Sequence, residues 1–141
     1  MERITLNLIP KGYKTTCHVS QFDNGRLIQL DLLEGSAPYV LKEGDAVSLK
    51  VLKPDGVCMA SSLPAVAEQT FVILTVTSDM SDLDGRSLCE LRVTNGSTDV
   101  GSADFYMEVK KSVEAVPPVP GRQGGLSATE RVITSTTYET L

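Results

Sequence analysis

Apolar and polar residues alternate with a period of two over most of the first 112 residues of the chain. Such alternation predicts strands with one buried and one solvent-facing side, because successive side chains of a strand point to opposite faces. Gly, Pro, Asn and Asp residues separate the segments, as turns require. The predicted inward-facing sets are Ile4, Leu6 and Leu8; Ile28, Leu30 and Leu32; Val47, Leu49 and Val51; and Ala103, Phe105, Met107 and Val109.

The segment Lys53-Pro-Asp-Gly56 carries the strongest local turn signal. Proline presets φ, aspartate is favoured in turns, and glycine supplies a positive φ without steric cost. We therefore expect Ala46–Leu52 and Val57–Ala60 to form a hairpin around this turn.

Further strands are expected at Phe71–Thr77, which is apolar enough to be buried, and at Ser87–Val93. Asn95-Gly96 predicts a turn into the next strand. Ser78–Gly85 differs, because two apolar residues three apart follow capping-type residues, and this spacing predicts one short helical turn. About eight short strands predict an all-β fold, an immunoglobulin-like antiparallel β-sandwich with an extended C-terminal arm.

The composition changes after Ser112, which predicts three regions. Residues 1–112 are expected to form the sandwich domain. Residues 113–125 are rich in Pro and Gly and predict an extended linker. Residues 126–141 form a C-terminal arm, in which Ser127–Glu130 resembles a helix-capping box but the β-branched and aromatic residues that follow favour an extended strand.

The arm is too apolar for a purely solvated tail. We hypothesise that it is an assembly tether that adds a strand to the sheet edge of a neighbouring subunit, where backbone hydrogen bonds give affinity. The alternative is that it folds back onto its own domain or stays loose. The candidate partner-binding residues are Leu126, Val132, Ile133, Tyr138 and Leu141.

The net charge and the search for targeting signals argue against two classes of partner, nucleic acids and membranes. The net charge of −5, from 13 basic and 18 acidic residues, argues against nucleic acid as a partner. The N-terminus alternates polar and apolar residues instead of forming a signal peptide, and no apolar run approaches the ~18 residues that span a bilayer. We expect a protein that is made in the cytoplasm and has no membrane partner.

The three cysteines, Cys17, Cys58 and Cys89, are odd in number and widely separated. Each lies in an apolar, strand-like context, so we expect three buried thiols and no disulfide framework. A zinc site is not expected either, since the chain has one histidine and no Cys-x-x-Cys pair.

Candidate catalytic and metal-binding groups are few. A nucleophile–base relay would need His18, but its neighbour Cys17 points to the opposite face of a strand. Asp79, Asp82 and Asp84 precede Gly85 as in a calcium loop, yet Met80 and Leu91 occupy the first and last ligand positions of that pattern. We expect no catalytic residue, no cofactor and no metal, and hence no enzyme.

Several segments taken in order resemble a known family. They are Gln21–Gly35, Val47–Gly56 with its Lys-Pro-Asp-Gly turn, Gly85–Val93 and Ser102–Val109. Across roughly residues 2–112 they are similar to the N-terminal domain of the phage baseplate upper protein family, from tailed phages and prophages of Gram-positive bacteria.

The resemblance implies a β-sandwich virion component at the baseplate or tail tip, made in the host cytoplasm, that binds other virion proteins and copies of itself in a symmetric assembly and is available to hold a fibre. Family members commonly continue into a long helical stalk, whereas 29 residues follow Ser112 here. Two alternatives remain open. One is a head-surface protein that decorates the capsid or anchors a head fibre, and the other is a free-standing immunoglobulin-like carbohydrate-binding or adhesin module.

Overall fold

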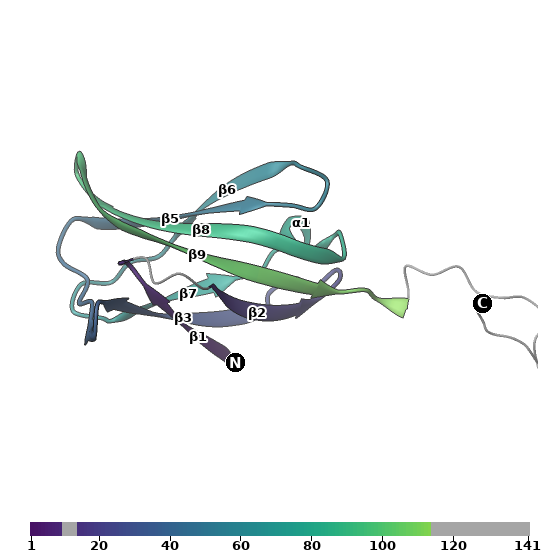
Figure 1. The fold of residues 1–141 in the computed structure, drawn as a ribbon, viewed down its shortest axis with the longest axis horizontal. Coiled ribbons are helices and arrows are strands. Elements are labelled where there is room, and N and C mark those ends of the chain that lie inside the picture. The colour runs from purple at the N-terminus through teal and green to yellow at the C-terminus, as the bar shows by residue number, and fades with distance from the viewer. Residues whose placement is uncertain (10–13, 114–141) are drawn as a thin grey trace, which may run out of the picture.

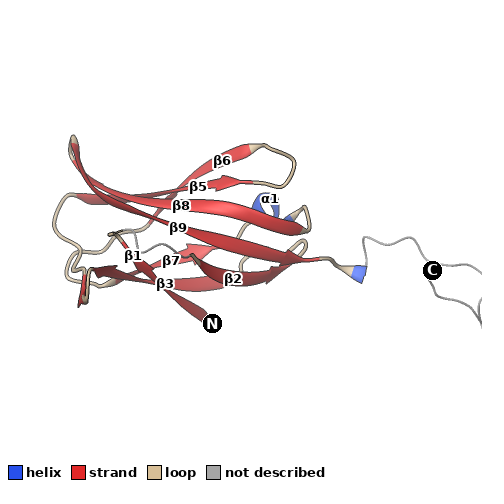
Figure 2. Cartoon of the chain, in the orientation of Figure 1, coloured by secondary structure: helices blue, strands red, loops and turns tan. Residues whose placement is uncertain are grey.

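The computed structural model describes residues 1–9 and 14–113, which form a β-sandwich of two sheets (Figure 1). The first sheet, in which β3 pairs with the other three strands, contains β1 (Glu2–Asn7), β3 (Leu27–Glu34), β4 (Ala37–Pro38) and β7 (Phe71–Thr75). The second sheet, in the order β2-β9-β8-β5-β6, contains β2 (Thr15–Ser20), β5 (Asp45–Leu52), β6 (Cys58–Leu63), β8 (Gly85–Asn95) and β9 (Thr98–Lys110). The all-β sandwich expected from the sequence is confirmed, with the predicted helical turn present as α1 (Ser78–Ser81) (Figure 2).

The core lies between the two sheets and is built from the predicted alternating residues. All four predicted inward-facing sets are buried, and Phe105 is the largest side chain without solvent exposure. The alternation places these residues on the inner faces of the two sheets, which pack against each other to form the core. No helix in the described residues is both long enough and apolar enough to cross a membrane.

The Lys53–Gly56 turn forms as predicted and joins β5 to β6. Gly56 has φ +88°, its N–H donates to Lys53 O at 2.9 Å, and Lys53 N–H donates to Val57 O at 2.9 Å. The β8–β9 turn also forms, with Gly96 and Ser97 between the paired residues Asn95 and Thr98. Gly96 has φ +62°, so its freedom at positive φ is used at the first central position of this turn.

The two sheets are mixed, which corrects the expectation of purely antiparallel pairing. β1 runs parallel to β3, and β2 runs parallel to β9. The period-two pattern reports which side chains are buried and not the direction of the neighbouring strand. Because β1 and β2 belong to different sheets, they do not pair as a hairpin. Each is instead an edge strand of its own sheet and pairs in parallel with the strand beside it.

The expectation of three buried thiols is wrong at Cys58. Cys17 and Cys89 are buried, but Cys58 is exposed, and all three are free thiols. The hairpin register decides this, because Cys58 lies opposite Leu52, and both side chains point to the outer face of the sheet. Apolar neighbours in the sequence did not reveal which face Cys58 would occupy.

Candidate interaction surfaces

The candidate catalytic pair does not come together. The Cys17 side chain lies in the core, where burial, with a smaller contribution from Glu2, raises the pKa of its thiol to about 12. His18 faces solvent on the other side of β2, with its Nδ1 3.3 Å from Glu2 Oε2. A buried, protonated thiol and an imidazole on the opposite face cannot act as nucleophile and base.

The aspartates of the Asp79–Asp84 loop also diverge. Asp82 Oδ1 lies 2.6 Å from Lys53 Nζ, and the Lys53 side chain is only 8% exposed. Asp79 and Asp84 are exposed. Within residues 1–9 and 14–113, no three potential metal-ligating side chains converge. The Asp82 carboxylate instead balances a buried ammonium group and ties the β5–β6 turn to the end of α1.

One end of the sandwich gathers several loops around the point where the described chain ends, and we call it the exit end. It comprises the β2–β3 loop, the β5–β6 turn, α1 and residues 110–113. Gln21 connects three of these parts: its N–H donates to Lys110 O at 2.7 Å, its Nε2 donates to Asp82 O at 2.9 Å, and its Oε1 accepts from Ser112 N–H at 3.0 Å. These bonds hold the exit end together.

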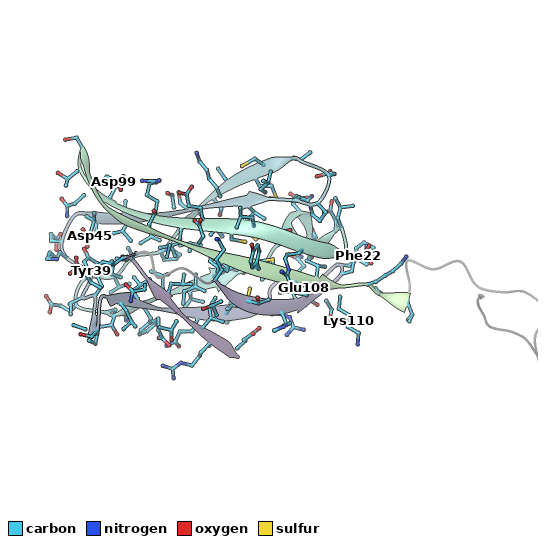
Figure 3. The ribbon with its side chains drawn as sticks, in the orientation of Figure 1. Phe22, Tyr39, Asp45, Asp99, Glu108 and Lys110 are labelled. Carbon is cyan, nitrogen blue, oxygen red and sulfur yellow. The ribbon has the colours of Figure 1, made fainter. Side chains whose placement is uncertain are left out.

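Phe22, at the exit end, combines an unusual backbone with an exposed aromatic ring. Its φ is +72°, a region that favours glycine or asparagine, and the residue is 48% exposed (Figure 3). The tight turn Ser20–Asp23 produces this φ, since Asp23 N–H donates to Ser20 O at 3.0 Å and Phe22 N–H donates to Ser81 O at 2.9 Å. Backbone strain of this kind costs about 1–3 kcal/mol and is often found at functional positions.

Both the side chain and the backbone of Asp23 hold the Phe22 turn in place. The Asp23 carboxylate accepts the N–H of Ser20 at 2.8 Å and also bonds Arg26 Nε. Burial opposes ionisation of Asp23, but these two bonds outweigh burial, so the pKa of Asp23 lies below its ordinary value. The hydroxyl of Ser81, a buried residue, donates to Asp23 O at 2.7 Å. The ring of Phe22 is thus presented on a rigid support.

The opposite end of the sandwich is held by a polar cluster around Asp45 (Figure 3). The Asp45 carboxylate accepts hydrogen bonds from the Tyr39 hydroxyl at 2.8 Å, the Lys42 N–H at 2.8 Å and Asn95 Nδ2 at 2.8 Å. Burial opposes ionisation of Asp45, but the three donors outweigh it and lower its pKa. Burial together with the bond to Asp45 raises the pKa of Tyr39 to about 12. This cluster fixes the start of β5 against the end of β8.

The two long sides of the sandwich differ in how their strand edges are treated. On one side β1 and β2 lie close together, and side chains of one strand satisfy the backbone of the other. Glu2 Oε1 accepts the N–H of His18 at 2.9 Å, and the Thr15 hydroxyl donates to Thr5 O at 3.3 Å. We call this the closed side, because side chains of each edge strand form hydrogen bonds with backbone groups of the other.

The other side, the open side, is bordered by β6 and β7. Neither strand contains a charged residue, and the exposed edge of neither has a strand partner among the described residues. In Figure 1 most of β6 rises away from β7. Edge strands usually carry charge, proline or a bulge to prevent further pairing. The open side is therefore the part of the described fold best suited to accept another strand.

The sequence did not identify these features. The predicted partner-binding residues Leu126, Val132, Ile133, Tyr138 and Leu141 lie outside the described residues, as do the linker from residue 114 onward and the arm. Nothing at Phe22 marked a positive φ, because aromatic residues rarely adopt one. Asp45 and Asn95 were visible as turn residues, but their meeting depends on the β5–β8 register.

Comparison with solved structures supports the fold. The chain is similar to the N-terminal domain of phage TP901-1 ORF48, with a TM-score of 0.59 and 14% sequence identity, over 78% of this chain and 98% of that domain. At this identity the similarity shows a shared fold. No protein-family model and no curated protein matches the sequence.

A second structure is more distant. CopC from Methylosinus trichosporium OB3b aligns with a TM-score of 0.44 and 13% identity over 70% of this chain and 86% of that one. This weak likeness carries no argument about function.

Proposed function

We propose that this chain is a phage structural protein, a virion component whose sandwich anchors it to neighbouring virion subunits at the baseplate or tail tip. The observation that carries the proposal is the similarity of fold to nearly the whole N-terminal domain of a phage protein, TP901-1 ORF48. The segments quoted from the sequence suggest a phage baseplate family over roughly residues 2–112, although no protein-family model matches the chain. The baseplate location is the finer part of the proposal.

The surfaces of the sandwich suit a binding role. Phe22 displays an aromatic ring on a strained but well-supported turn, and the open side offers unpaired strand edges. Aromatic anchors and strand addition are both common in protein–protein recognition. The proposed partners are other virion proteins and further copies of this chain in a symmetric assembly, with no nucleic acid, membrane, cofactor or enzymatic reaction involved.

The test is made on phage particles produced by cells that carry the gene. Quantitative mass spectrometry of purified virions, followed by separation of heads from tails, measures both presence and location. We expect the chain to be present at a fixed copy number per particle and to be enriched in the tail fraction. Enrichment in the head fraction would replace the baseplate location by the head-surface alternative. Absence of the chain from purified particles would overturn the proposal.

A further inference from the structure

The free edge of β6 lacks the features that normally prevent strand addition. Its six residues, Cys58–Leu63, contain no charge and no proline, and its pairing with β5 shows no register shift from Leu52 and Cys58 to Val47 and Leu63. Leu52 and Val57, beside the start of the strand, are exposed apolar residues. An uncharged, regular edge of this kind is a template for another strand.

β7 is uncharged as well, but its surroundings are less suitable. The outer surface beside β7 carries the ion pair between Arg3 and Asp31. Asp31 belongs to the neighbouring strand β3 and lies opposite Phe71 of β7. An incoming apolar strand would have to pack beside this ion pair, whereas the neighbouring strand of β6 carries one charged side chain on its outer face, Lys50 opposite Ala60. β6 is therefore the better acceptor of the two.

The pattern of hydrogen bonds between β5 and β6 shows which backbone groups of β6 are free to bond to an added strand. Lys53 N–H donates to Val57 O, and because bonded pairs alternate in an antiparallel ladder, Met59 and Ser61 also bond toward β5. The N–H and C=O groups of Cys58, Ala60 and Ser62 consequently point away from β5. These three residues form the accepting edge, and their side chains lie on the outer face.

We propose that this edge accepts residues 132–138 of a second copy of the chain as an added strand. The proposal rests on the proposed function, because it names how copies assemble. The segment reads Val-Ile-Thr-Ser-Thr-Thr-Tyr, seven residues without charge or proline, in a chain with 31 charged residues among 141 (13 basic plus 18 acidic). Its β-branched residues and uncharged character match what the β6 edge requires.

The length of chain beyond the described part allows this contact. The described chain ends at Val113, at the same end of the sandwich as the β5–β6 turn from which β6 begins (Figure 1). Residues 114–131 provide 18 residues of spacer (131 − 114 + 1). Fully extended, such a spacer spans about 60 Å, and as a coil about 23 Å. The longer value exceeds the length of a 13-residue strand such as β9, about 43 Å, so a neighbouring copy is within reach.

The native Cys58 makes a direct test possible, because it is the exposed one of the three cysteines and lies on the accepting edge. Cysteine is introduced singly at 133, 134, 135, 136 and 137 of the full chain, and each variant is oxidised mildly and run on a non-reducing gel. Pairing predicts covalent dimers whose yield alternates with period two, several-fold higher at positions that share the outer face with Cys58. The same variants with Cys58→Ser are the control and give no such dimer.

A second variant addresses the backbone directly. Ala60→Pro removes an N–H that points away from β5, so we expect the melting temperature to stay close to that of the parent while the cross-linked dimer is lost. Ser61→Pro is the matched control, since the N–H it removes points toward β5 and its loss destabilises the fold.

The outcomes separate this inference from the proposed function. Equal cross-linking at all five positions, or dimers that persist in Ala60→Pro, would show that β6 is not the acceptor. Disulfides formed within one chain would show that the segment returns to its own edge and would overturn the role of a second copy. In each case, presence in virions would leave the proposed function standing, whereas absence from virions would remove it.

Discussion

Phe22 places a bulky aromatic side chain where the backbone has a positive φ, although a smaller residue could form the same turn at lower cost. The neighbouring Asp23 and Ser81 hold the turn, and Phe22 remains nearly half exposed. Strain maintained by several hydrogen bonds beneath an exposed ring is more easily explained by recognition than by stability.

The strain at Phe22 can be measured by comparing two truncations. Phe22→Ala and Phe22→Asn both remove the ring, but asparagine tolerates positive φ better than alanine does. We expect Phe22→Asn to be the more stable of the two by about 1 kcal/mol in thermal or urea unfolding. Equal stability of the two variants would show that the turn does not strain residue 22.

Asp45 supports a prediction on pH dependence. Its folded-state pKa lies below its ordinary value of 3.8, so its ionised form stabilises the fold above that pH, and the contribution is lost as pH falls through the lowered pKa. Asp45→Asn should therefore lower the melting temperature at pH 7, at a cost on the order of 1 kcal/mol, with the deficit shrinking below about pH 4. Asp104→Asn, at an exposed position of β9, is the control and should cost little at any pH. A deficit that stays constant down to pH 2 would contradict the role of the carboxylate.

The elements show what the sequence could and could not establish. Alternation identified the buried faces of β1, β3, β5 and β9, because burial of a face depends on side-chain polarity alone. Turn residues located the β5–β6 hairpin, because Pro54 and Gly56 act through their own backbones. The parallel direction of β1 and β2, the exposure of Cys58 and the cluster around Asp45 all depend on pairing between distant segments. Local patterns carry no information on such pairing.

The β5–β6 hairpin depends on glycine at its turn. Gly56 has φ +88°, and a Cβ added there would meet no atom within 4 Å, so a substitution acts through backbone strain and not through a clash. Gly56→Val is expected to destabilise the protein by about 1–3 kcal/mol, and Gly56→Asn by less, because asparagine tolerates positive φ. Urea unfolding measures both. An unchanged midpoint for Gly56→Val would remove the assignment of strain to this turn.

At the scale of the molecule, the sandwich is asymmetric. The closed side uses Glu2 and Thr15 to satisfy the backbone of the adjacent edge, whereas the open side leaves the edge of β6 without a strand partner in the described part of the chain. The chain leaves the described fold at the exit end, the same end of the sandwich as the turn that leads into β6 (Figure 1). With the proposed donor segment, each copy would have one donor and one acceptor edge, as a head-to-tail assembly requires.

This division of roles predicts that assembly and folding can be separated by truncation. The described core and its hydrogen bonds lie within residues 1–113, so deleting residues 114–141 should leave the melting temperature of the sandwich nearly unchanged. The same deletion should abolish incorporation into particles, because it removes the proposed donor segment while leaving β6 intact. A second variant, the full chain with Val132→Asp and Ile133→Asp, keeps the length of the chain but places charges in the proposed donor segment. It should also fail to assemble, which would show that the segment and not the length of the chain is required. Normal incorporation of the truncated chain would refute the tether, and a large fall in its melting temperature would show that the missing residues stabilise their own domain.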